Sequence, residues 1–170
     1  MSPVLLRWNL LPPQEAAKEI LPCCGSRAWA SGMGSSRPFQ DTATLLATSD
    51  RIWRDLPTAD WLEAFHSHPR IGEPRSAEES SARSQNWSAQ EQSRAAETGD
   101  SLKLALAEAN REYEERFRRI FIICATGKSV EEILANLHQR LNNDDATELQ
   151  EAAEQQRQIV QIRLRKWLAE

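Results

Sequence analysis

The sequence is poor in glycine, cysteine and tyrosine and has no long apolar run. Glycine accounts for only 6 of 170 residues. β-Branched residues are sparse beside Ala, Leu, Glu, Gln and Arg, so an all-β fold is disfavoured and helices are favoured. Three cysteines, two of them adjacent at Cys23 and Cys24, suit neither a disulfide framework nor a zinc site, which predicts a reducing, cytoplasmic environment. No segment approaches the ~20 apolar residues of a membrane span.

An excess of positive charge is also missing. Lys and Arg total 21 against 25 Asp and Glu, which gives a net charge of −4 and a pI near 5.5. Nucleic-acid binding requires a basic surface, so we expect neither a nucleic acid nor a membrane as partner. The apolar start, residues 1–13, is interrupted by Arg7 and Asn9 and follows no basic segment, so it is not predicted to be a signal peptide.

Apolar periodicity and capping residues predict an all-α fold. The length suits a single compact domain over residues 1–170, with about seven or eight helices and some short irregular segments. Gly32, Gly34, Ser35 and Ser36 are expected to interrupt helical structure after Trp29. The predicted helices cover residues 14–21, 42–56, 58–68, a segment opening at Ser88, a stripe over 102–117, a segment opening after Ser129, and 145 nearly to the end.

The segment from Glu73 to Ser88 is rich in Ser, Glu and Arg and offers little to bury. It is predicted to be an exposed loop. Ser88 and Glu91 then fit a capping box at the start of a helix, and a carboxylate in the first turn also interacts favourably with the helix dipole. By contrast, Phe121–Ala125 is wholly apolar and is predicted to be buried, as helix, strand or extended chain.

Arg163 breaks the apolar pattern of the last predicted helix. At 100° per residue from Leu149, it lies at about −40° and Gln156 at about −20°, both on the apolar side. A buried guanidinium needs a partner. An internal salt bridge, a side chain reaching the rim, and a ligand anion all remain open interpretations, and the first two are commoner.

His66 and His68 lie one residue apart, directly before Pro69. Three interpretations compete: structural histidines, a metal site, and a catalytic imidazole held by the bend that Pro69 imposes. A metal-dependent hydrolase would need a third ligand, and no H-E-x-x-H pattern supplies one.

Six segments in order along the chain resemble the OHCU decarboxylase family, which acts on 2-oxo-4-hydroxy-4-carboxy-5-ureidoimidazoline (OHCU) in urate degradation. They are Arg37-Pro38-Phe39; residues 65–72, FHSHPRIG; Ser88-x-x-Glu91-Gln92; Asn110-x-x-Tyr113-x-x-Arg116-Phe117; Phe121–Ala125; and residues 148–164, ending in Ile162-Arg163-Leu164. Together they span essentially the whole chain.

The resemblance implies an all-α homodimeric enzyme that needs no metal or organic cofactor and forms (S)-allantoin and CO2. It implies that His68 is the catalytic acid/base and Glu91 its carboxylate partner. The implied substrate-binding residues are Pro69, Ser88, Ala89, Gln90, Glu91, Gln92, Phe121, Ile122, Ile123, Cys124, Ala125 and Arg163. A catalytically inactive helical ligand-binding module of the same fold is the alternative, and the presence of both His68 and Glu91 disfavours it.

Overall fold

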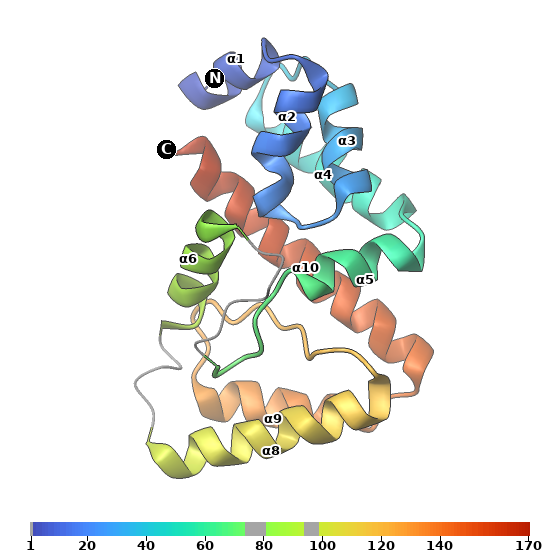
Figure 1. Cartoon of the computed structure of the whole chain (residues 1–170), viewed down its shortest axis with the longest axis vertical. Coiled ribbons are helices and arrows are strands. Elements are labelled where there is room, and N and C mark those ends of the chain that lie inside the picture. Colours follow the sequence, from blue (N-terminus) through green and yellow to red (C-terminus); the bar gives the residue numbers. More distant parts are fainter. Residues whose placement is uncertain (1, 74–80, 94–98) are drawn as a thin grey trace. The chain divides into compact units, whose positions relative to one another are not determined.

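The computed structural model describes residues 2–73, 81–93 and 99–170, and every regular element in these ranges is helical (Figure 1). The all-α prediction is therefore confirmed. The elements are α1 (Pro3–Asn9), α2 (Pro13–Ile20), the 3-10 turn η1 (Leu21–Cys23), α3 (Arg27–Ser35), α4 (Thr42–Asp55), α5 (Thr58–His66), α6 (Ala82–Glu91), α8 (Asp100–Phe117), α9 (Val130–Arg140) and α10 (Asp145–Leu168). No helix in the described ranges has the length and hydropathy of a membrane span.

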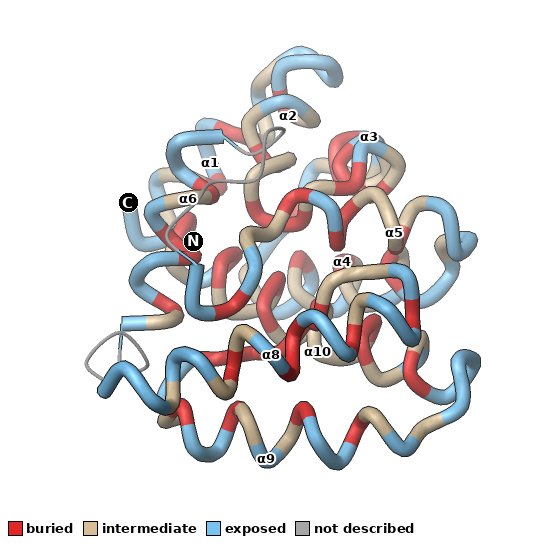
Figure 2. Tube along the Cα trace, turned by 60° about the horizontal axis from the view of Figure 1, so that its bottom comes forward, coloured by how far each residue is buried: buried red, intermediate tan, exposed pale blue. Residues whose placement is uncertain are grey.

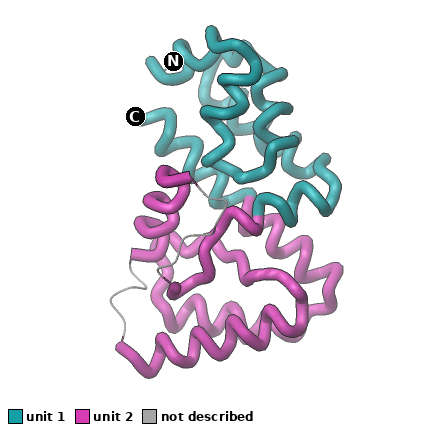
Figure 3. Tube along the Cα trace, viewed as in Figure 1, with its two compact units in different colours: residues 1–64, 157–170 teal, residues 65–156 magenta. Residues whose placement is uncertain are grey.

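The chain forms two compact units (Figure 3). Unit 1 comprises residues 1–64 and 157–170, and unit 2 comprises residues 65–156. The helices α5 and α10 each continue from one unit into the other.

The core of unit 1 is built around tryptophans. Trp8, Trp29 and Trp167 are almost fully buried. The indole N–H of Trp8 donates to the Ala16 carbonyl at 2.9 Å, and that of Trp61 donates to the Trp53 carbonyl at 2.8 Å. These bonds let large aromatic surfaces be buried without stranding a polar N–H.

Two helices of unit 1 differ from the sequence prediction. The first helix, α1, was missed, although Ser2 caps it by accepting from the Leu5 amide and Pro3 opens it. The predicted break is wrong at Gly32 and Gly34, because α3 continues through both, but it is correct at Ser35 and Ser36, where the helix ends and is capped. A Cβ at Gly34 would lie 3.3 Å from the Pro13 carbonyl oxygen, so this glycine permits close packing of α2 and α3 rather than ending a helix.

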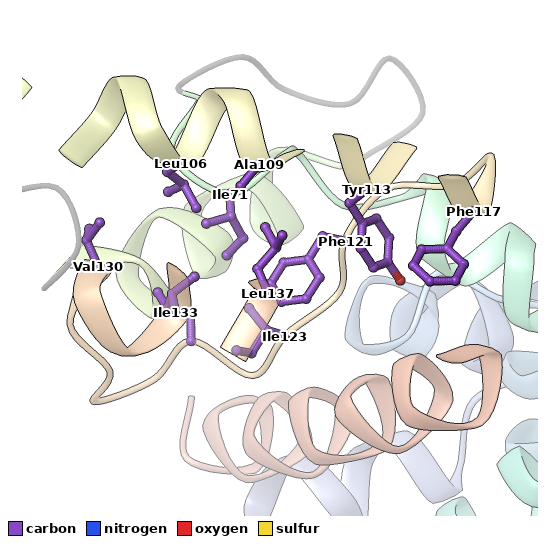
Figure 4. Close-up of a cluster of buried hydrophobic side chains, with 11 residues drawn as sticks. Ile71, Leu106, Ala109, Tyr113, Phe117, Phe121, Ile123, Val130, Ile133 and Leu137 are labelled. Atoms are coloured by element: carbon purple, nitrogen blue, oxygen red, sulfur yellow. The ribbon is translucent and has the colours of Figure 1, made fainter. Parts of the chain in front are cut away.

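Unit 2 is organised around α8 and α9, which pack side by side (Figure 1). Buried residues recur at helical spacing along both helices (Figure 2). The capping box predicted at Ser129 and Glu132 is confirmed: the Ser129 hydroxyl accepts from the Glu132 amide, and the Glu132 carboxylate accepts from the Ser129 amide. The hydrophobic cluster of this unit consists of Ile71, Leu106, Ala109, Tyr113, Phe117, Phe121, Ile123, Ala125, Val130, Ile133 and Leu137 (Figure 4).

Helix α6 overturns the prediction for the segment before Ser88. It begins at Ala82, where the Ser81 hydroxyl accepts from the Ser84 amide, so residues 81–88 are not a loop. Residues 74–80 of the predicted loop lie outside the described ranges. Ser88 is inside this helix and Glu91 is its last residue, so the capping box predicted there is wrong and the first-turn dipole argument does not apply.

The buried residues of α6 explain the error. Ser84, Trp87, Ser88 and Glu91 follow helical spacing and form the buried side of the helix. Three of these four residues are polar, so hydropathy alone does not mark the face.

Candidate functional site

The segment that carries His68 is a tight turn at the end of α5. The helix ends at His66, and the His68 amide donates to the Phe65 carbonyl at 3.1 Å. His68 is half-buried and its Nε2 is screened from solvent, whereas His66 is exposed. The predicted end of the helix before Pro69 is confirmed, and the two histidines occupy different environments.

Hydrogen bonds from two helices hold the backbone just after this turn. The Asn110 side-chain amide of α8 donates to the Ile71 carbonyl at 3.0 Å. The Gly72 amide donates to the Gln92 side-chain oxygen, at the end of α6, at 3.1 Å. Ile71 is also buried in the hydrophobic cluster. The backbone that follows the His68 turn is therefore anchored by hydrogen bonds and by packing.

The second predicted segment, Ser88–Gln92, therefore meets the His68 segment through the bond between Gln92 and Gly72. Ser88 and Glu91 are buried, while the side chains of Ala89 and Gln90 are exposed. Gln92 lies at the C-cap of α6. Its side-chain oxygen accepts from Gly72, and the NH2 group of the same amide can act as a hydrogen-bond donor to another group.

The third predicted segment, Phe121–Ala125, is buried throughout, as the sequence predicted. It has no regular secondary structure. Phe121, Ile123 and Ala125 belong to the same hydrophobic cluster as Ile71. Unit 2 therefore brings together three of the segments that the resemblance selects: the turn at His68, the end of α6, and this apolar run.

Specific side chains hold the backbone of the apolar run. Arg140 donates through Nη1 to the Ile122 carbonyl at 2.8 Å. The Cys124 amide donates to the side-chain oxygen of Gln155 at 2.9 Å, and Lys128 donates to the Cys124 carbonyl at 2.7 Å. A segment without helix or strand thus satisfies buried backbone groups through side chains of neighbouring elements.

A buried polar network next to this run was not predicted from the sequence. Arg140 donates through Nε and Nη2 to the same oxygen of Glu148, at 2.9 and 2.6 Å. The Tyr113 hydroxyl donates to that oxygen at 2.5 Å, and Asn143 donates to the other oxygen at 3.0 Å. Arg140 also lies over the Phe121 ring, 4.4 Å from its centroid.

The spacing of α9 contains the signal that would have revealed this network. Arg140 follows Ile133 and Leu137 at i+7 and i+3, on the buried side of the helix. It is a cation on an apolar face, the same pattern that singled out Arg163.

Tyr113 provides a spectroscopic test of the network, because it is the only tyrosine in the chain. Burial and the hydrogen bond to Glu148 raise the pKa of Tyr113 above its ordinary value of 10.0. We expect no phenolate absorbance as a native solution passes through pH 10–11, and its appearance only when alkali unfolds the protein. The chain in guanidinium chloride should titrate normally; a native sample that titrates in the same way would contradict the buried bond.

Gly72 is predicted to be intolerant of a side chain. Its φ is +82°, and a Cβ would lie 3.0 Å from Leu106 Cδ2. Gly72→Ala should lower the free energy of unfolding by about 1–2 kcal/mol, measured by urea denaturation. Gly127→Ala is the matched control, since Gly127 has φ of +77° and no atom within 4 Å of an added Cβ. This control carries the backbone strain without the contact, so its loss of unfolding free energy should be smaller. Equal losses in the two variants would show that the contact with Leu106 costs nothing.

Arg163 belongs to unit 1 and is fully buried, as its place on the apolar side of α10 predicted. Its Nη1 lies 3.4 Å from the Pro22 carbonyl. Gln156, also predicted to face inward, is fully buried in unit 2. Arg116, in contrast, is exposed and donates to the Asn143 carbonyl.

The cysteines and histidines were the other candidates for special chemistry. All three cysteines are buried thiols. Within the described parts of the chain, no three His, Cys, Asp or Glu side chains gather as metal ligands would. The three segments that unit 2 brings together carry the His68 imidazole, the buried Glu91 carboxylate, the Gln92 side-chain amide and anchored backbone groups. These residue types are suited to proton transfer and hydrogen bonding.

Several known proteins are similar in sequence to this chain. The family model for OHCU decarboxylase matches residues 9–165. The chain is 35% identical over 144 residues to a uric acid degradation bifunctional protein of Arabidopsis thaliana, covering 85% of this chain and 44% of the relative, so it spans less than half of that protein. It is 32% identical over 136 residues to an OHCU decarboxylase of Amia calva, covering 79% of this chain and 77% of the relative.

Solved structures share the fold. A crystal structure of OHCU decarboxylase in the presence of (S)-allantoin matches with a TM-score of 0.77 and 36% identity, over 89% of this chain and 98% of that chain. A crystal structure of (S)-allantoin synthase matches with a TM-score of 0.70 and 17% identity, over 96% of this chain and 53% of that chain, which is a likeness of fold. With the family model covering nearly the whole sequence, the chain belongs to the OHCU decarboxylase family.

Proposed function

We propose that this protein is a cofactor-independent decarboxylase that converts OHCU to (S)-allantoin and CO2. Beyond family membership, the observation that carries the proposal is the convergence in unit 2. The Gln92–Gly72 bond links the end of α6 to the His68 turn, and the hydrophobic cluster links that turn to Phe121–Ala125.

The chemistry requires little from the protein besides orientation and a proton. Cleavage of the bond between the ring carbon and the carboxylate releases CO2. The electron pair left behind forms a C=C bond to the neighbouring carbon, while the pair of the imidazoline C=N bond moves onto the ring nitrogen, which takes up a proton. The substrate hydroxyl then loses its proton as its carbon becomes a carbonyl. A proton is delivered to the neighbouring carbon, which bears the ureido group. Because the substrate itself accepts the electron pair, no organic cofactor is needed.

His68 is assigned the proton transfers, and Glu91 is assigned to orient the imidazole and stabilise its charged form. The half-buried position of His68 on an anchored turn suits this role. General acid–base catalysis of this kind contributes about 10²–10⁴ in rate. Delivery of the proton to one face of the planar intermediate would give a single enantiomer.

The other residues are assigned to binding. Pro69, Ser88, Ala89, Gln90 and Gln92 would line the site, with polar groups for the ring and ureido amides. Phe121–Ala125 would contribute through its backbone. Arg163 would hold a substrate anion; strong binding of the carboxylate that leaves would also stabilise the ground state, so its role is binding rather than chemistry.

We propose further that residues 1–170 act as a single domain, in a cytoplasmic homodimer. The match of one family model to residues 9–165 supports the domain assignment. The three buried thiols suit a reducing compartment. Sedimentation equilibrium of the purified chain tests the dimer: a mass of twice 19.3 kDa is expected, and a monomer at micromolar concentration would contradict it.

The function is tested by adding the purified protein to OHCU generated from urate immediately beforehand. The decay of OHCU and the release of CO2 should become faster than the spontaneous reaction, in proportion to protein concentration and after exhaustive chelation. A rate no faster than the spontaneous one would favour the inactive ligand-binding module, and loss of the rate on chelation would favour a metal-dependent enzyme.

A further inference from the structure

Ile123 lies between two backbone anchors that the catalytic assignment does not use. Arg140 of α9 holds the Ile122 carbonyl at 2.8 Å, and Gln155 of α10 holds the Cys124 amide at 2.9 Å. Each anchored group is one end of a peptide unit whose other end belongs to Ile123. All these residues lie in unit 2.

Because peptide units are planar, these two anchors also fix the directions of the N–H and the carbonyl of Ile123. Both flanking peptide bonds are trans, so the carbonyl and N–H of each unit point in opposite directions. The N–H of Ile123 must therefore point away from Arg140, and its carbonyl must point away from Gln155. A guanidinium on the Ile122 carbonyl also polarises that peptide unit and makes the Ile123 N–H a better donor.

The anchors are themselves held in place. Arg140 makes two bonds to Glu148, whose carboxylate also accepts from Tyr113 and Asn143. The amide of Gln155 donates to Glu151 at 3.0 Å, one turn earlier on α10. That bond fixes which end of the Gln155 amide faces Cys124.

We infer that Arg140 and Gln155 are positioning residues that fix the N–H and carbonyl of Ile123 as an adjacent donor and acceptor for the amide groups of the substrate. This inference rests on the proposed function, since it assigns these two groups to the ring or ureido amides of OHCU. An amide-like edge presents a donor beside an acceptor and is complementary to such a pair. Neither positioning residue takes part in proton transfer.

Gln155→Met tests the inference with little change in side-chain volume. Loss of the acceptor for the Cys124 amide should raise KM for OHCU, and the Kd of (S)-allantoin, by about tenfold, the factor expected for one neutral hydrogen bond. The kcat should change by less than about threefold, because binding shared by the ground and transition states is what is lost. Gln150→Met, an exposed position on the same helix, should change neither constant.

A swap of the two α10 side chains provides the rescue. In Glu151→Gln/Gln155→Glu, the amide now donates from position 151 and a carboxylate at 155 accepts from the Cys124 amide. Both bonds are restored, so KM and Kd should return to within about threefold of the unaltered protein. The double variant Arg140→Met/Glu148→Leu, which removes both buried charges together, should raise both constants like Gln155→Met.

A purely structural role predicts a different pattern, in which the melting temperature falls but KM and Kd of the folded protein do not. Unchanged KM and Kd in folded Gln155→Met, or a swap that fails to restore them, would overturn the inference. An unaltered protein without turnover would overturn the proposed function instead, and the allantoin Kd series would still decide whether Gln155 positions a ligand-binding segment.

Discussion

Replacing His68 with Asn is expected to lower kcat for OHCU decarboxylation by about 10²–10⁴. Asparagine is close in size and can form hydrogen bonds, but it cannot exchange a proton near neutral pH. Because Asn110 and Gln92 hold the backbone that follows the turn, the variant should still fold. Stopped-flow assay of turnover, with circular dichroism to check helicity, measures both effects.

His66→Asn is the matched control for this experiment. It makes the same substitution two residues earlier, at an exposed position. It should change kcat by less than about threefold, since an exposed side chain on the last turn of α5 has no place in the proposed proton transfer. Near-normal turnover in the His68 variant, or equal losses in both, would contradict the assignment of His68.

Replacing Glu148 with Leu is expected to cause the largest loss of stability. Glu148 is fully buried and Arg140 is 4% exposed, so removal of the carboxylate leaves a guanidinium without its counter-charge in the core. The free energy of unfolding should fall by about 3–5 kcal/mol in urea denaturation. Part of that loss comes from Tyr113 and Asn143, which also donate to Glu148.

Two variants separate the buried charge from ordinary packing. Arg140→Met/Glu148→Leu should recover most of the lost stability, because it leaves no unpaired ion. Arg27→Ala breaks an ion pair with Glu63 in which the Arg27 side chain is 81% exposed, and it should lower the free energy of unfolding by less than about 1 kcal/mol. A single Glu148 variant as stable as Arg27→Ala would show that the network contributes little.

Elements with strong apolar periodicity and clear caps were predictable from the sequence. The last helix begins at Asp145 as predicted and continues to Leu168, and the Ser129 capping box is present. Arg163 was correctly placed on the buried side because a helical angle depends only on sequence spacing. These features are local, so the residues that specify them lie within a few turns of one another.

Most of the errors involve tertiary contacts that override local preference; the missed helix α1, with its Ser2 cap and Pro3 in the first turn, is the exception. Gly34 remains helical because it packs against the start of α2. Serines form much of the buried side of α6, which hydropathy assigned to a loop. The Arg140–Glu148 pair joins two helices, and periodicity can identify a buried charge but cannot name the residue that neutralises it.

The stereochemistry of the product tests the central claim most directly. OHCU that decays in solution is protonated on both faces and gives racemic allantoin. A protein that holds the intermediate and protonates one face should give an excess of the (S) enantiomer, visible by circular dichroism at the end of the reaction. Racemic allantoin from a mixture in which the protein outpaces spontaneous decay would contradict an ordered site built on the His68 turn.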